Sequence, residues 1–201
     1  DVALISEAGM PGLSDPGYEL IRAAVKYGYP VVPIPGPSAP VTALVVSGLP
    51  CDSFVYLGFL PRRRNERRGL LAEVVQERRT LVFFEAPHRL RKSLADIEDV
   101  LGDRLLVICR ELTKLHEEVW RGTVAKARAH FDKVEPRGEF TLVIAGASEE
   151  RERWDDGRVQ AALGELLAQG VPRTAAARHI AAASGWNRAA VYKLSLEVGR
   201  N

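Results

Sequence analysis

Short apolar segments alternate with helix-like segments over residues 1–146, and this alternation constrains the fold more than any other feature of the sequence. Strands that alternate with helices are typical of α/β proteins. The last three apolar segments follow one another with less helix between them, which predicts a mixed sheet. Strands are expected at residues 2–6, 30–34, 54–59, 80–84, 104–110, 118–122 and 139–144, and helices at 15–26, 38–46, 65–77, 87–101 and 124–131.

The pattern changes after residue 146. Residues 147–156 are charged and polar, which is typical of a linker, and three alanine-rich helices are expected after it, at 159–168, 174–183 and 188–198. The chain also opens directly on an apolar, strand-like segment, so we expect a preceding N-terminal segment to be missing. The expected domains are residues 1–51, the remainder of a first α/β subdomain; 52–146, a second α/β subdomain; 147–156, a linker; and 157–201, a helical module.

Composition excludes several classes of protein. The 201 residues are 46% hydrophobic and 27% charged, as in a globular protein. No apolar run approaches the length of a membrane span, and no secretion signal opens the chain, so a soluble cytoplasmic protein is expected. Cys51 and Cys109 lie in or beside apolar stretches and are expected to be buried free thiols. No Cys or His pair has metal-ligand spacing, so no metal site is expected.

Two loops rich in glycine and proline, residues 6–17 and 33–38, each follow an expected strand and precede an expected helix. Ligands of open α/β sheets bind at the carboxyl ends of strands, and small residues let a ligand approach the backbone closely. The loops are therefore candidates for the wall of a nucleoside-like cofactor site. Two ordinary tight turns are the alternative, and neither loop has a dinucleotide or Walker pattern.

A third strand-to-helix junction, residues 84–89, carries a carboxylate, an imidazole and a guanidinium. Glu85 or His88 could take a proton there, and Arg89 could hold a phosphate. The alternatives are a Glu85 that stabilises the N-terminus of the following helix and a solvated His88.

Five arginines cluster within residues 62–68, at the start of an expected helix, although the net charge of the chain is only +2. Arginine side chains match phosphate oxygens well, and several of them at a helix N-terminus oppose the helix dipole unless an anion compensates. This favours RNA over a solvated helix start. Another charged segment, residues 110–118, could contact an RNA backbone through Lys114 and His116, or could simply be solvated. The clustered arginines are Arg62, Arg63, Arg64, Arg67 and Arg68.

The helical module has the spacing of a helix-turn-helix at Ala181, Gly185 and Val191. A nucleic-acid-binding regulator is therefore one alternative function for the whole chain. A stable three-helix cap, or a module that touches RNA by charge alone, explains the same pattern. Positive charge on the module comes from Arg173, Arg178, Arg188 and Lys193.

Six ordered groups of motifs, taken together, resemble the family of ribosomal RNA small-subunit (cytidine-2′-O)-methyltransferases, within the tetrapyrrole methylase superfamily. The resemblance covers residues 1 to about 146, and the helical tail is also similar to the family. Where that family usually has Asp-Ala-Gly-Thr-Pro, this chain has Glu7 and Met10. The motifs are residues 6–11 with 14–17, 33–39, 58–61, 84–89, 110–118 with 121–123, and 138–144.

The resemblance implies an α/β fold of two domains with S-adenosylmethionine between them, a homodimer, and methyl transfer to the 2′-hydroxyl of a cytidine in 16S ribosomal RNA of the small ribosomal subunit. A tetrapyrrole or other small-molecule methylase on the same fold is the alternative. Glu85 would be the base, with Lys114 or Arg89 as the cation, and no metal. The donor would be bound by Gly9, Met10, Pro11, Pro35, Gly36, Ser38 and Ala39, and the RNA by Arg62, Arg63, Arg64, Arg67, Arg68, His88 and His116.

Overall fold

The structure of the protein is a computed structural model that describes residues 2–6, 8–148, 154–184 and 186–198. The chain forms two compact units, Asp1–Ser148 and Glu149–Asn201. Within the described residues, no helix is both long enough and apolar enough to cross a membrane.

The first unit is built on a five-stranded mixed sheet, so the predicted mixed sheet is confirmed. The strand order is β1-β2-β5-β3-β4. β1 pairs with β2 in parallel, whereas β5 is antiparallel to both β2 and β3, and β4 is antiparallel to β3. β1, β2 and β3 therefore run in one direction and end at one edge of the sheet. The strands are β1 (Phe54–Phe59), β2 (Thr80–Glu85), β3 (Leu105–Arg110), β4 (Glu118–Thr123) and β5 (Phe140–Ile144).

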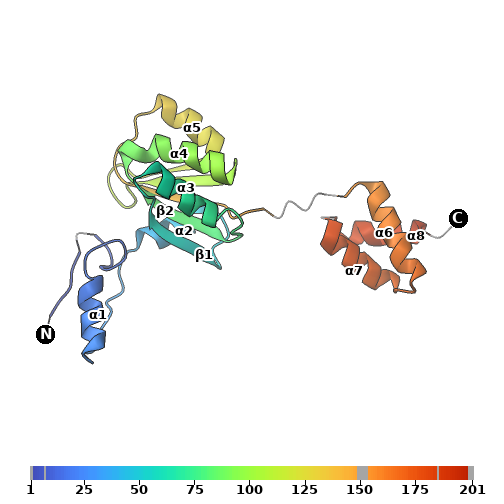
Figure 1. Ribbon diagram of the computed structural model, residues 1–201, viewed down its shortest axis with the longest axis horizontal. Helices are drawn as coiled ribbons and strands as arrows, with labels where there is room; N and C mark the ends of the chain where they lie inside the picture. The colour runs from blue at the N-terminus through green and yellow to red at the C-terminus, as the bar shows by residue number, and fades with distance from the viewer. Residues whose placement is uncertain (1, 7, 149–153, 185, 199–201) are drawn as a thin grey trace. The chain divides into compact units, whose positions relative to one another are not determined.

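Helices cover both faces of this sheet (Figure 1). α3 (Arg64–Glu73), α4 (Pro87–Leu101) and α5 (Val124–Lys133) lie over one face, and α2 (Ala39–Ser47) packs on the other. Side chains alternate between the faces of a strand, and β2 shows this directly. Leu81 and Phe83 join the larger core under α3, α4 and α5, while Val82 packs with Leu44 of α2.

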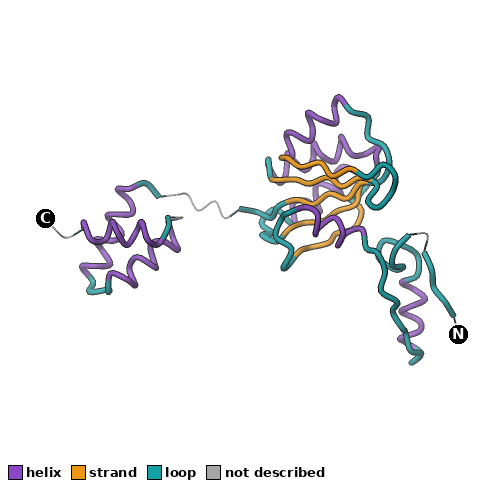
Figure 2. The backbone as a smooth tube through the Cα atoms, turned by 180° about the vertical axis from the view of Figure 1, so that it is seen from behind, coloured by secondary structure: helices purple, strands orange, loops and turns teal. Residues whose placement is uncertain are grey.

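Two predicted strands are wrong: residues 2–6 and 30–34 are not strands, and they flank helix α1 (Tyr18–Lys26). An apolar run becomes a strand only if a neighbouring strand satisfies its backbone N–H and C=O groups. Within the described residues, neither segment pairs with a strand (Figure 2). The apolar side chains that were expected in a core are exposed instead: Val2 (85%), Ile5 (86%), Val32 (76%) and Ile34 (78%).

The two cysteines are free, but only one of them matches its expected environment. Cys109 is buried in β3, and burial raises the pKa of its thiol to about 11. Cys51 is exposed. The prediction of a buried thiol was wrong for Cys51, because this residue lies in the loop before β1 and not in the strand itself.

The described residues of the second unit form three helices, α6 (Asp156–Ala168), α7 (Arg173–Ser184) and α8 (Arg188–Glu197). Its core includes Leu163 of α6, Ile180 of α7 and Val191 of α8. Within the helix-turn-helix spacing, Ala181 packs on this core and Val191 is fully buried. Gly185 lies outside the described residues.

Candidate functional site

Three of the loops singled out in the sequence open on one edge of the sheet. This follows from the common direction of β1, β2 and β3, whose last residues are Phe59, Glu85 and Arg110. Phe140, the first residue of β5, pairs with both Glu85 and Arg110 and so lies at the same edge. The topology therefore brings three segments to this edge: residues 60–63 after β1, which we call the arginine loop, the junction after β2 and the charged loop after β3.

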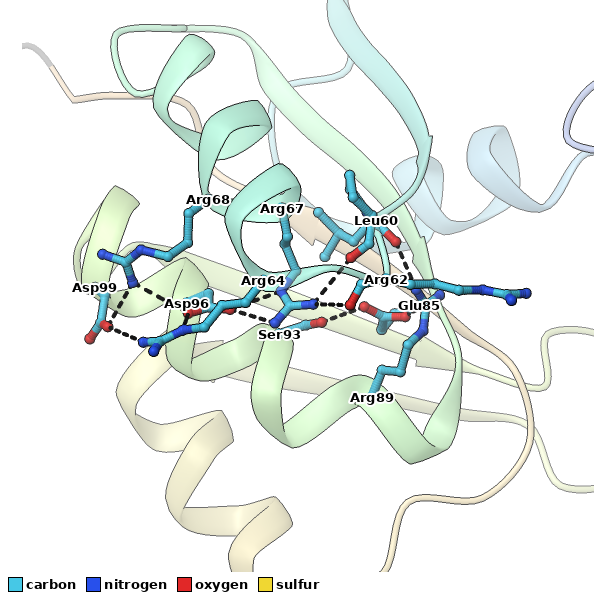
Figure 3. Close-up of polar contacts among 11 residues, drawn as sticks. Leu60, Arg62, Arg64, Arg67, Arg68, Glu85, Arg89, Ser93, Asp96 and Asp99 are labelled. Carbon is cyan, nitrogen blue, oxygen red and sulfur yellow. Dashed lines mark hydrogen bonds and ion pairs between the residues drawn. The ribbon is translucent and has the colours of Figure 1, made fainter.

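Glu85 is buried at this edge, and its carboxylate is fully engaged. Oε1 accepts from the backbone N–H of Ala86 at 2.7 Å. Oε1 also lies 2.6 Å from Nη2 of Arg89, and Oε2 accepts a short hydrogen bond from Ser93 (Figure 3). The Glu85 side chain is 0% exposed. The carboxylate is thus enclosed by protein groups in this structure, and the role of Glu85 as the catalytic base stays a prediction.

Arg89 bridges the ends of two strands. Its Nη1 donates to the carbonyl oxygen of Leu60, just after β1, at 2.9 Å, while its Nη2 pairs with Glu85 at the end of β2. The Arg89 side chain is 13% exposed. Arg89 thus fixes the arginine loop against α4 and shows only a small part of its surface to a ligand.

The arginine cluster divides into a buried member and a more exposed group around it. Arg67 is 4% exposed and donates to Asp96 of α4 and to the backbone carbonyls of Pro61 and Arg62 (Figure 3). This side chain joins α3 to α4 in the structure, and a contact of Arg67 with RNA stays a prediction.

The remaining arginines stay closer to solvent. Arg64 donates from Nε to Oδ1 of Asp96 at 3.0 Å and is 67% exposed, and Arg68 is held mainly by Asp99, at 2.9 Å. Arg63 pairs with Glu66, on its own helix, at 3.2 Å. Arg62 is exposed at the start of the loop.

A concave surface lies between this loop and α4. One hollow of about 560 Å³ is lined by cationic and polar side chains of both elements, and a second hollow of about 390 Å³ adjoins it toward the sheet edge. Arg62, His88 and Arg89 line both hollows. Lys92 and Asp96 also line the first one, and sequence reasoning did not single them out. Successive spacings of four along the predicted helix 87–101, from His88 to Lys92 and from Lys92 to Asp96, were the signal that could have found them.

The charged loop after β3 is held in a defined conformation. Glu111 and Thr113 have positive φ angles of 47° and 64°, and Oε1 of Glu111 accepts from the backbone N–H of Glu139 at 2.8 Å. Nζ of Lys114 lies 2.9 Å from Oε2 of Glu139, and that hydrogen bond raises the pKa of Lys114. Lys114 is 47% exposed and His116 is exposed, so both can reach a ligand at this edge.

The two glycine- and proline-rich loops meet directly. The backbone N–H of Met10 donates to the carbonyl oxygen of Pro37 at 3.0 Å. Gly9 has φ +75°, and a Cβ there would lie 2.5 Å from the same oxygen, so only glycine permits the contact. Glu7 lies outside the described residues. The remaining residues expected at the donor site are also exposed or half-buried: Pro11, Pro35, Gly36, Ser38 and Ala39.

The donor loops also touch the sheet. The hydroxyl oxygens of Ser14 and Tyr56, a β1 residue, are 2.5 Å apart. Partial burial raises the pKa of the Tyr56 phenol, so this group remains a neutral hydrogen-bonding partner. This contact places the loop of residues 6–17 beside β1, the strand that leads into the arginine loop. Among the described residues, no group of three or more His, Cys, Asp or Glu side chains could hold a metal ion.

Comparisons with known proteins add three findings. A family described as Tetrapyrrole (Corrin/Porphyrin) Methylases matches residues 1–128. The chain is 45% identical over 200 residues to a Synechocystis sp. protein named ribosomal RNA small subunit methyltransferase I, covering 98% of the chain and 72% of the relative. A protein of the same name from Thermotoga maritima is 50% identical over 145 residues, and the match covers 72% of the chain but only 65% of that relative.

Among solved structures, the methyltransferase CobJ superposes with a TM-score of 0.53 at 16% sequence identity, covering 69% of this chain and 62% of CobJ. At this identity the likeness concerns the fold alone.

Proposed function

Because the chain belongs to the tetrapyrrole methylase family, in the branch whose members are named ribosomal RNA small subunit methyltransferase I, we propose that it is an S-adenosylmethionine-dependent methyltransferase of 16S ribosomal RNA. The acceptor is the 2′-hydroxyl of a cytidine. The observation that carries this proposal is the 45% identity to the Synechocystis relative, which extends over 98% of the chain. The protein acts in the cytoplasm, and its partners are the small ribosomal subunit and a second copy of the chain.

The two loops that meet at Met10 and Pro37 fit a nucleoside-like donor. Small residues leave the backbone open to close approach, and Gly9 occupies a place that a Cβ would fill. The donor supplies a sulfonium that is already a strong methylating agent. The loops bind and orient it, and alignment with the acceptor oxygen can lower the barrier greatly. As the 2′-hydroxyl oxygen forms its bond to the methyl group, the bond from that group to sulfur breaks, S-adenosylhomocysteine leaves and the hydroxyl proton passes to solvent.

On the acceptor side, Lys114 is the best-placed cation of the expected catalytic residues. Its ammonium is half-exposed at the sheet edge and is held by Glu139, so it can lie near the ribose hydroxyl and stabilise the negative charge that develops on the oxygen as its proton leaves to solvent. Glu85 and Arg89 have a different task, which is to hold the arginine loop and the start of α4 in place. This assigns positioning to the buried pair and charge stabilisation to the exposed lysine.

The test is transfer of a labelled methyl group from S-adenosylmethionine to small ribosomal subunits that lack the modification. Both the chain and a version extended with the segments that full-length relatives carry outside the matched region should be assayed. Label in a 2′-O-methylcytidine of 16S RNA, found by nuclease digestion and mass spectrometry, is the expected result. Label on uroporphyrinogen III and none on RNA would support the small-molecule alternative and contradict the proposal.

A further inference from the structure

The two hollows beside α4 form one continuous surface, which we call the basic groove. Its floor on α4 is set by His88, Arg89, Lys92, Ala95 and Asp96, spaced so that they share one face of the helix. At 1.5 Å per residue, the stretch from His88 to Ala95 extends the groove by about 10 Å. The arginine loop forms the opposite wall.

Charge in the basic groove is strongly unbalanced. Five cationic side chains line it, against one lining carboxylate, Asp96. Two further carboxylates lie nearby: Glu85 is buried behind Arg89, and Asp99 pairs with Arg64. Within the part of the chain that the structure describes, Arg62 and Lys92 are exposed and take part in no ion pair. The cations that line the groove are Arg62, Arg64, Arg67, Arg89 and Lys92.

The walls of the basic groove are rigid. Arg67 binds Asp96 and also the carbonyls of Pro61 and Arg62, and Arg89 binds both Glu85 and the carbonyl of Leu60. The backbone that carries Arg62 is therefore fixed by two nearly buried guanidinium groups. A backbone that is held in place before binding loses less entropy when an anion arrives.

One end of the groove is aromatic. Phe59, the last residue of β1, lines the second hollow and is 53% exposed, and its ring centroid lies 5.3 Å from that of Phe84. Unpaired RNA bases stack on exposed aromatic rings of this kind. This end lies at the sheet edge where Lys114 and the loop after β3 are found.

We infer that the basic groove binds the backbone of single-stranded RNA, with Arg62 and Lys92 in contact with phosphates and Phe59 stacked on a base beside the reacting nucleotide. The inference rests on the proposed function and extends it to a docking path that leads from α4 to the sheet edge. Arg67 and Arg89 act in it as positioning residues. Exposed cations on a fixed backbone, beside an exposed ring, match a chain of phosphates that carries bases.

The experiment measures affinity for a fluorescently labelled single-stranded RNA oligonucleotide between about 50 and 200 mM salt. The double variant R62Q/K92Q is compared with K126Q/K133Q, which removes two exposed lysines from α5. We expect R62Q/K92Q to bind about tenfold more weakly at low salt, and the slope of log K against log salt to fall by about 0.7 for each phosphate that the variant no longer neutralises. The control should change neither, and R62K/K92R should retain the affinity.

Phe59→Leu separates stacking from charge. We expect it to weaken binding about tenfold while the salt slope stays unchanged, since the same cations still neutralise the phosphates. Equal losses in R62Q/K92Q and K126Q/K133Q, or an unchanged slope in R62Q/K92Q, would overturn the groove as the RNA site, and so would a wild-type chain that binds no RNA.

Calorimetric titration with S-adenosylmethionine tells failure of the groove from failure of the proposed function. A wild-type protein that binds the donor and methylates RNA, with unaltered RNA binding in the groove variants, would refute the groove and leave the function standing. Absence of donor binding in both the chain and its extended version would count against the proposed function itself. In that case, a salt-dependent loss of RNA affinity confined to R62Q/K92Q would still support the groove as an RNA site.

Discussion

Nε and Nη2 of Arg67 both donate to Oδ2 of Asp96, at 2.9 and 2.5 Å, although 29 positions separate the two residues in the sequence. Both side chains are almost fully buried, with exposures of 4% and 3%. The pair joins α3 to α4 beneath the basic groove, and its consequences for stability can be measured.

Asp96→Asn should lower the free energy of unfolding by about 3 to 5 kcal/mol, because it leaves the buried Arg67 charge without its partner. Asp99→Asn is the matched control on the same helix: Asp99 also pairs with Arg64 and Arg68, but it is 48% exposed. That change should cost less than about 1 kcal/mol. Urea denaturation followed by circular dichroism measures both, and similar losses in the two variants would contradict a special role for the buried pair.

The same pair predicts a pH dependence. Burial raises the pKa of Asp96, but hydrogen bonds from Arg64, Arg67 and Arg68 outweigh it and leave the pKa below the ordinary value of 3.8. A depressed carboxyl pKa gives stability that is complete above the unfolded pKa and is lost as pH falls through the folded one. The difference in unfolding free energy between wild type and D96N should therefore stay constant from about pH 7 to about pH 5 and shrink below about pH 4. If this difference in unfolding free energy shrinks near neutral pH, another titratable group is responsible for it.

Glu85→Gln should act on stability and not on the chemical step. It removes the buried partner of Arg89, which should cost about 3 kcal/mol, while the pH profile of methyl transfer in the extended version keeps its shape. Ser93→Ala is the companion variant, because it removes only the hydroxyl that donates to Glu85. A stable E85Q protein without turnover would instead support Glu85 as the catalytic base.

Gly9→Ala should separate the two donor loops. Its Cβ would lie 2.5 Å from the carbonyl oxygen of Pro37, so we expect affinity for S-adenosylmethionine to fall at least about tenfold. Gly28→Ala is the control: φ at Gly28 is +74°, nearly the same as at Gly9, but nothing lies within 4 Å of the added Cβ. Both variants carry the backbone strain of a left-handed alanine, and only G9A should lose donor affinity in calorimetric titration. Equal losses would mean that strain, and not contact between the loops, controls binding.

The sequence by itself determined the elements whose causes are local. Helix α4 was predicted at residues 87–101 and is observed as Pro87–Leu101, since Pro87 suits the first turn and the leucines and Ile97 share one face. The five strands of the sheet were recognisable from their apolar runs. The motif loops were recognisable as well, and the topology brings the arginine loop, the junction after β2 and the charged loop to one edge.

Only the tertiary structure decided which charged groups are free to act. Whether Arg67 or Arg62 faces solvent depends on how α3 packs against α4, and the partner that buries Arg67 comes from a distant part of the chain. The enclosure of Glu85 by Arg89 and Ser93 is likewise visible only in the folded chain. Residues 2–6 and 30–34 have the composition of strands, but strand formation requires a partner that no local pattern supplies. Local patterns record propensity and the face that is buried, whereas ion pairing and strand pairing are relations between segments that only the folded chain brings together.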